Sequence, residues 1–294
     1  MPLPSLDATV HAYPTLDVSA LRDELCKNGA AIVQVYDPQD AEDASIVAEY
    51  AVGIDNVAAR VRDAGKTPHG AKGIGIVKNY GFGCQEEVWS ARTDGRVRRV
   101  FALLAGAEPA EMAVGCDAVA YLGPDAARAN MSANKAQLSP RNAFFDKTGG
   151  KLDLHIDICP SGSSPGNEAE RKMAELHPQM PYCVQGQLTL RAVERGGPAL
   201  VVVPGAHKAL KPAHFNAGRD FATCTDDGYA RYAGQHRAVD GLRPGALVLW
   251  LSRLPHANKL ADAGCNPRRS AVFLSWQHRA IGGDSTQQQE MKKR

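Results

Sequence analysis

One short stretch of the chain, KLDLHIDIC at residues 151–159, alternates strictly between apolar and polar residues. The apolar positions are Leu152, Leu154, Ile156 and Ile158, and the polar positions are Asp153, His155, Asp157 and Cys159. Because successive side chains of a strand point to opposite faces, this pattern predicts a β-strand with one apolar face. The other face carries side chains of the kind that bind metal ions.

Further apolar or alternating runs follow one another from about residue 112 and are bounded by Gly, Pro, Asn or Asp. They are AVGCDAVAYLG, YCVQGQLTLRAV, ALVVVPG, GALVLWLSRLP and RRSAVFLSW. Short runs between turn residues predict antiparallel strands, so residues 112–280 are predicted to form a jelly roll or barrel. Two long stretches between the runs, 161–181 and 208–240, are predicted to be loops that cover a site.

The first 111 residues have a different pattern and are predicted to be a mostly helical support region. Residues 16–52 predict a helix, a strand and a second helix, and the Asn28-Gly29 pair ends the first helix. Residues 86–106 predict one helix, with an apolar stripe through Val97 and Leu104.

Three arginines, Arg92, Arg96 and Arg99, lie on another face of that predicted helix. We interpret them as a solvated face. Arg92 is kept as a candidate substrate-binding residue because it follows Trp89 by one helical turn.

Composition indicates a single domain over residues 1–294, with a flexible polar tail at 281–294. A chain with 44% hydrophobic and 22% charged residues can bury a full core. Its net charge of +2 is too weak to hold nucleic acid, so we expect a small-molecule substrate. Neither a signal peptide nor a run of about 18 apolar residues occurs, which predicts a soluble, cytoplasmic protein without membrane contact. The oligomeric state stays open.

Cysteine usage excludes two further classes. The seven cysteines are odd in number and never form a C-x-x-C motif. This spacing argues against a disulfide framework and against a structural zinc site.

His155 and Asp157 occupy positions i and i+2 of the predicted strand, so their side chains share one face and can share a metal ion. The best third ligand is His256, at the end of the apolar run GALVLWLSRLPH. Two histidines and one carboxylate with open positions form the facial triad of non-haem Fe(II) oxygenases. His207 is a rival ligand that we interpret as a structural loop residue.

A carboxylate-bearing co-substrate would need a cationic anchor, and Arg268 and Arg269 open the next predicted strand. Only one of these neighbours can point into the site, and alternation alone does not say which. Ser270 would share a face with Arg268 and could donate a hydrogen bond to the same ligand, which favours Arg268.

The order His-x-Asp, GGPALVVVPGAHK, RLPHANK and PRRSAVFLSW resembles the phytanoyl-CoA dioxygenase-like family of the Fe(II)/2-oxoglutarate-dependent oxygenases, over roughly residues 20–280. The resemblance implies a mainly β fold with flanking helices, whose core is a double-stranded β-helix (a cupin-like jelly roll). It implies that His155, Asp157 and His256 bind Fe(II) and that Arg269 binds 2-oxoglutarate. On this point we follow the resemblance rather than Ser270.

The resemblance further implies a hydroxylase that uses O2 and 2-oxoglutarate and releases succinate and CO2. Gln185 is its candidate substrate residue, and Asn258 is expected to hydrogen-bond the co-substrate. Ile156 departs from the glutamine common after the first histidine, which suggests a changed pocket. Three alternatives remain: a non-catalytic metal- or ligand-binding jelly roll, a zinc hydrolase, and a related halogenase, which Asp157 disfavours because a halide would take the place of that carboxylate.

Overall fold

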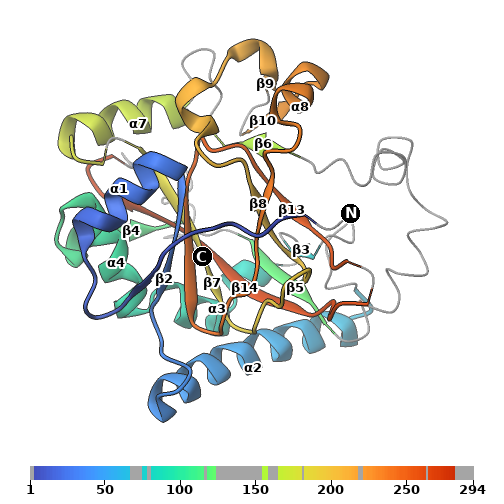
Figure 1. Ribbon diagram of the computed structural model, residues 1–294. Helices are drawn as coiled ribbons and strands as arrows, with labels where there is room; N and C mark the ends of the chain where they lie inside the picture. The colour runs from blue at the N-terminus through green and yellow to red at the C-terminus, as the bar shows by residue number, and fades with distance from the viewer. Residues whose placement is uncertain are drawn as a thin grey trace.

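The computed structural model describes residues 3–66, 75–77, 81–115, 118–123, 154–157, 165–180, 182–217, 221–262 and 264–281. Two β-sheets lie in its centre, and helices cover one of them (Figure 1). The predicted mainly β fold with flanking helices is confirmed, and the core is a jelly roll.

The larger sheet is eight-stranded and has the order β1-β2-β12-β7-β14-β5-β3, with β4 paired to β14. Its strands are β1 (Val10–Ala12), β2 (Ala30–Gln34), β3 (Ile76–Val77), β4 (Met112–Val114), β5 (Val119–Leu122), β7 (Val184–Thr189), β12 (Ala246–Leu251) and β14 (Arg269–His278). The central strands β7, β12 and β14 are the apolar runs of the second half. Strand β7 pairs antiparallel with β12 on one side and with β14 on the other, as predicted from the turn residues between the runs.

The smaller sheet is six-stranded and has the order β11-β8-β13-β6-β10-β9. Its strands are β6 (His155–Ile156), β8 (Ala199–Val202), β9 (Phe215–Ala217), β10 (Ala222–Cys224), β11 (Arg237–Val239) and β13 (His256–Lys259). Strand β6 lies between β10 and β13 and pairs antiparallel with both.

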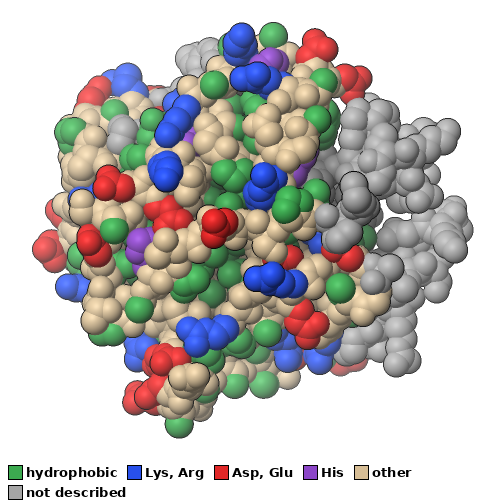
Figure 2. Space-filling model, in the orientation of Figure 1, with side chains coloured by type: hydrophobic (Ala, Val, Ile, Leu, Met, Phe, Trp, Pro, Cys, Tyr) green, Lys and Arg blue, Asp and Glu red, His purple; other side chains and the backbone are tan. Residues whose placement is uncertain are grey.

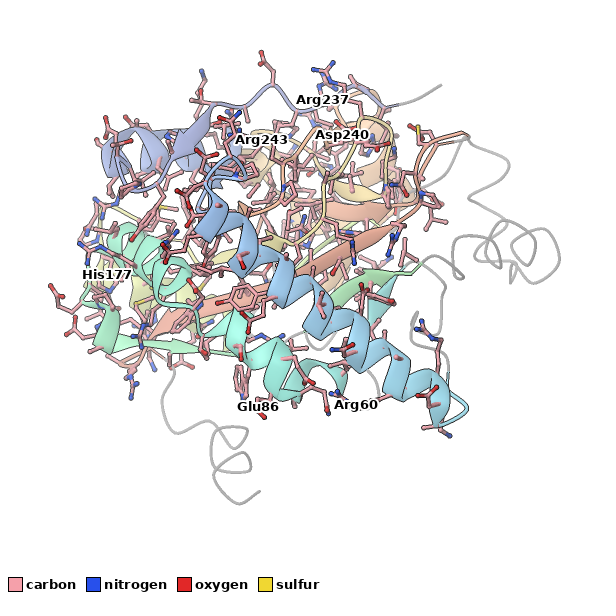
Figure 3. The ribbon with its side chains drawn as sticks, turned by 90° about the horizontal axis from the view of Figure 1, so that it is seen from below. Arg60, Glu86, His177, Arg237, Asp240 and Arg243 are labelled. Atoms are coloured by element: carbon pink, nitrogen blue, oxygen red, sulfur yellow. The ribbon has the colours of Figure 1, made fainter. Side chains whose placement is uncertain are left out.

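Helices cover the outer face of the larger sheet. The α-helices of the described residues are α1 (Val18–Asn28), α2 (Ala41–Asp63), α3 (Glu86–Arg92), α4 (Gly95–Ala105), α7 (Pro165–Leu176) and α8 (Asp226–Tyr232). Figure 3 shows α2 and α3 across this face, with Arg60 of α2 beside the start of α3, where it forms an ion pair with Glu87. Short 3-10 helices lie at Phe82–Cys84, Pro109–Glu111, Ala206–Ala209 and Pro212–His214.

Strand β7 illustrates how alternation separates the two faces of the larger sheet. A Cβ at Gly186 would lie 3.0 Å from the Phe101 ring of α4, so this position faces the helices. The neighbouring Gln185 and Gln187 therefore point to the interior between the two sheets. The same register places Trp250 of β12 beside Gln185, and Phe273 of β14 beside Gln187, on that interior face.

Two predictions about the helical region are resolved by local signals. The first helix does end at Asn28, where Gly29 takes a left-handed conformation with φ 81°. The single helix predicted over residues 86–106 is wrong, because Asp94 caps the backbone amides of Arg96 and Val97 and starts a new helix there.

The two predicted long loops are also wrong as loops. Within 161–181, α7 forms, and its exposed face carries Arg171–Glu175 and Lys172–Glu168 ion pairs at helical spacing. The stretch 208–240 contains β9, β10, β11 and α8. Residues 282–294, predicted to be a flexible tail, lie outside the described residues.

Charged side chains of both signs are interspersed on the face in Figure 2, in keeping with the net charge of +2. None of the helices in the described part of the chain has the length and apolar content to cross a membrane.

Candidate functional site

Three side chains from the smaller sheet and its adjoining turn converge on one point. His155 lies on β6 and His256 on β13, and these two residues are directly opposite each other in the antiparallel pair. Asp157 follows β6 by one residue, and its backbone N–H donates to the carbonyl of Ser252 at 2.9 Å. The alternation of the sequence is realised here, since Leu154 and Ile156 are fully buried in an apolar cluster on the other face.

The ligand atoms of His155, Asp157 and His256 all lie within 4.8 Å of one another. Nε2 of His256 is 3.3 Å from one carboxylate oxygen of Asp157, and Nε2 of His155 is 3.9 Å from the other. The two imidazole rings have centroids 4.4 Å apart. Two imidazoles and one carboxylate on one side of a shared point match the donor set of a facial triad with open positions.

Hydrogen bonds hold two of the ligands in orientation. Nδ1 of His256 lies 2.8 Å from the carbonyl oxygen of Leu254, to which it can only donate, so Nε2 keeps its lone pair for a metal ion. The Gln185 side chain hydrogen-bonds Asp157. Such outer contacts fix ring and carboxylate orientation in metal sites, so the residues present fit a divalent metal ion.

Electrostatic coupling within the triad keeps the carboxylate ionised. Burial by itself would raise the pKa of Asp157, but the charges of His256 and His155 outweigh it and the pKa lies below its ordinary value. Burial would likewise lower the pKa of His256, and the Asp157 carboxylate raises it instead. Asp157 therefore attracts positive charge to this point, which a metal ion would supply.

A buried guanidinium lies in the interior near the triad. Arg269, the first residue of β14, is 2% exposed. Its Nη1 donates to Oδ1 of Asn258 at 2.8 Å, and its Nη2 donates to Oε1 of Gln187 at 2.9 Å. Both acceptors are neutral, and no carboxylate pairs with Arg269 among the described residues. Burial lowers its pKa to about 10.

The neighbouring candidates Arg268 and Ser270 have different surroundings. Ser270 is paired with Tyr121 of β5, on the opposite face of β14 from Arg269, and its hydroxyl is buried with no hydrogen-bond partner among the described residues. Arg268 precedes β14 and is partly exposed. Ser270 was expected to share with Arg268 the face of the strand that points into the site. That face instead points to the helices that cover the larger sheet.

Arg92 does not lie on a solvated face. It is fully buried, and its guanidinium donates to the main-chain carbonyls of Gly83, Ala118 and Phe273, on the helix-covered side of the sheet. The solvated-face interpretation is therefore wrong for this arginine, and its role as a substrate residue loses support. His207 is buried too and bonds the carbonyl of Cys26, 3.1 Å away.

Three residues of the site carried no signal that sequence reasoning used. Gln187 contacts Arg269 across 82 positions of sequence. Trp250 packs its ring 5.6 Å from that of His256. Phe221, 47% exposed, contacts His155 edge-on with centroids 5.8 Å apart. Gln187 and Trp250 belong to apolar runs that predict strands, and only the strand pairing brings them to the site.

No family model and no curated protein matches the chain. Solved structures do share its fold. The epimerase SnoN, solved with Fe3+, alpha ketoglutarate and nogalamycin RO, is 18% identical at a TM-score of 0.53, over 88% of this chain and 83% of SnoN.

Two further structures show the same likeness. EctD from S. alaskensis, solved with 2-oxoglutarate and 5-hydroxyectoine, is 16% identical at a TM-score of 0.51, over 96% of this chain and 84% of EctD. GlcNAc Inducible Gene 2 (GIG2, DUF1479) from Candida albicans is 12% identical at a TM-score of 0.58, over 92% and 66%. At these identities the likeness establishes the fold, and the phytanoyl-CoA dioxygenase-like branch stays a prediction.

Proposed function

We propose that this protein is an Fe(II)/2-oxoglutarate-dependent dioxygenase that hydroxylates a small organic substrate and releases succinate and CO2. The observation that carries the proposal is a facial triad, His155, Asp157 and His256, beside a buried arginine whose charge no described acidic side chain compensates. A buried cation costs folding free energy unless an anion meets it. A dicarboxylate co-substrate supplies that anion.

The spacing along β13 supports the same ligand. Asn258, which holds the Arg269 guanidinium, lies two residues beyond His256 on the same face of the strand. Two strand residues span about 7 Å, so metal and guanidinium are separated by the length of a short carbon chain. One end of 2-oxoglutarate would chelate the metal, and its distal carboxylate would pair with Arg269.

The metal ion, when bound, would supply the chemistry that activates O2 against a C–H bond of the substrate. The chain's own residues would bind and orient. Asp157 supplies the negative charge of the ligand set, and Gln185 holds its orientation. Trp250, Val248 and Phe273 lie on the interior face of the larger sheet and would exclude water from a bound co-substrate.

Exposure indicates the side from which substrate would approach. The side chains of His155 and Asp157 are 23% and 25% exposed, whereas that of His256 is 4% exposed. Phe221 lies against the exposed edge of His155. Co-substrate would therefore occupy the deep side towards Arg269, and substrate would enter over Phe221.

The substitution Asp157→Ala tests the metal site. Loss of a ligand should exceed the roughly 10- to 100-fold effect typical of outer contacts, so iron content and 2-oxoglutarate-dependent succinate formation should both fall by more than about 100-fold. Circular dichroism would verify that the variant folds. Normal iron content together with normal succinate formation would rule out the triad.

A non-catalytic jelly roll with the same pocket is the second candidate. O2 uptake with added Fe(II) and 2-oxoglutarate separates the two, because a dioxygenase consumes O2 with at least one member of a broad substrate panel. A flat trace across that panel, with metal and 2-oxoglutarate demonstrably bound, would favour the binding module. Metal analysis after anaerobic purification would separate both from a zinc hydrolase. A halogenase is disfavoured because Asp157 occupies the position that a halide would need.

A further inference from the structure

We propose that Gln187 is a positioning residue that holds Arg269 for the distal carboxylate of the co-substrate while leaving the arginine's positive charge available. This inference rests on the proposed function and deepens it. It concerns a residue that does not touch the metal, so it can fail while the proposed function stands.

The two hydrogen bonds fix the guanidinium from opposite sides of the interior. Gln187 belongs to β7 of the larger sheet, and Asn258 belongs to β13 of the smaller sheet. Each takes one terminal nitrogen of the guanidinium, at 2.9 Å and 2.8 Å. The Arg269 side chain is therefore held in one orientation between the sheets without a ligand, which reduces the conformational entropy lost when a ligand binds.

The chemical identity of the acceptors is the central point. An amide oxygen accepts a hydrogen bond without cancelling the charge of the donor, whereas a carboxylate would form a charge-assisted pair with the guanidinium. A glutamate in place of Gln187 would have nearly the same shape and reach. Its carboxylate would also neutralise the positive charge of Arg269, with which the distal carboxylate of the co-substrate should pair. An amide at this position therefore favours ligand binding, whereas a carboxylate would favour only the stability of the folded protein.

The surroundings of Gln187 argue against a purely structural role. Its cross-strand neighbours are Val248 of β12 and Phe273 of β14, and Gln187 itself is 1% exposed. An amide in such apolar surroundings costs free energy unless it is hydrogen-bonded, and an apolar side chain would pack there at no such cost. The hydrogen bond from Arg269 is the interaction that accounts for an amide side chain at this position.

The deciding experiment compares two 2-oxo acids on the metal-loaded, anaerobic protein by titration calorimetry. 2-Oxoglutarate carries a distal carboxylate, and 2-oxobutyrate lacks it but offers the same chelating end. In the Gln187→Glu variant we expect the affinity for 2-oxoglutarate to fall at least about 30-fold, towards that for 2-oxobutyrate. The affinity for 2-oxobutyrate should be unchanged, since the metal site is intact.

A structural role makes the opposite forecast, because glutamate keeps the hydrogen bond and strengthens it. Unchanged 2-oxoglutarate affinity in Gln187→Glu would therefore overturn the inference, and so would an equal loss for both 2-oxo acids. If wild-type protein binds 2-oxoglutarate no more tightly than 2-oxobutyrate, the proposed function itself fails.

A second variant, Gln187→Met, tests the inference if the Gln187→Glu protein does not fold. It removes one of the two acceptors and adds no charge, so we expect an affinity loss for 2-oxoglutarate of about 5-fold and none for 2-oxobutyrate. Unchanged 2-oxoglutarate affinity in this variant would equally overturn the inference.

Discussion

Two buried arginines are associated with strand β14, and their surroundings differ in kind: Arg269 is its first residue, and Arg92 donates to its Phe273 carbonyl. Arg92, on the helix-covered side, donates to main-chain carbonyls of three separate segments, at Gly83, Ala118 and Phe273. Arg269, on the interior side, donates to two side-chain amides, those of Asn258 and Gln187.

The difference separates a structural role for the charge of Arg92 from a ligand-binding role for the charge of Arg269. Buried main-chain carbonyls need hydrogen-bond donors, and by donating to three of them Arg92 helps to hold helix α3 and its neighbours to the sheet. Side-chain amides hold Arg269 in place, and no described acidic side chain neutralises it. For a base, a pKa lowered by burial means that the folded protein disfavours the charged form, so Arg269 costs stability that an anionic ligand would return.

The largest expected effect is on stability, from Arg92→Met. Removal of the guanidinium takes one donor away from each of the carbonyls of Gly83, Ala118 and Phe273, and we expect the free energy of unfolding to fall by about 4 kcal/mol. Chemical denaturation measures this. The affinity of the folded fraction for 2-oxoglutarate should stay at the wild-type value. A comparable loss of affinity would erase the distinction between the two arginines.

Next in size is the effect of Arg269→Met on ligand binding. Loss of the guanidinium that would pair with the distal carboxylate should weaken 2-oxoglutarate binding about 300-fold, with little loss of stability because a buried charge is also removed. Arg268→Met is the matched control and should bind normally. If the control shows the loss instead, Arg268 is the anchor.

Thermodynamic linkage gives a third, smaller effect. At a 2-oxoglutarate concentration of about 100 times Kd, the metal-loaded wild type should gain about 2.7 kcal/mol in stability. The melting temperature should then rise by about 5 °C. The Arg92→Met protein should show the same rise and the Arg269→Met protein none. Equal shifts in all three proteins would mean that the ligand binds elsewhere.

The smallest expected effect concerns the orientation of Asp157. Gln185→Leu removes the side-chain hydrogen bond to that carboxylate, and we expect metal affinity to fall about 10-fold. Ser275→Ala, at the cross-strand neighbour of Gln185, is the matched control. If metal titration gives equal metal affinities for both variants, Gln185 does not orient Asp157 for metal binding.

Local pattern predicted the parts of the fold that local physics decides. Alternation around His155 and Asp157 predicted both the strand and the face that the two side chains share, because the two-residue period of a strand is a property of the backbone alone. The end of the first helix at Gly29 was predictable because it also depends on local backbone conformation, and glycine readily adopts the left-handed one. Thr225, which caps α8 and is followed by two acidic residues, is a further local signal for the start of a helix.

Long-range pairing decides the rest, and no local pattern contains it. Whether Arg268 or Arg269 faces the interior follows from the register of β14 on β5 and β7, where Arg269 lies opposite Leu122. Gln187 meets Arg269 only because two strands distant in sequence lie side by side. Arg92 shares its sequence spacing with Arg96 and Arg99, and only the packing of α3 against the sheet makes it a fully buried residue.

The most direct measurement of the central claim is a crystal structure of the protein grown anaerobically with Fe(II) and 2-oxoglutarate. The account predicts density for one metal ion bound by His155, Asp157 and His256, with 2-oxoglutarate chelating it and the distal carboxylate paired to Arg269. A metal ion bound elsewhere, or 2-oxoglutarate bound away from Arg269, would contradict it.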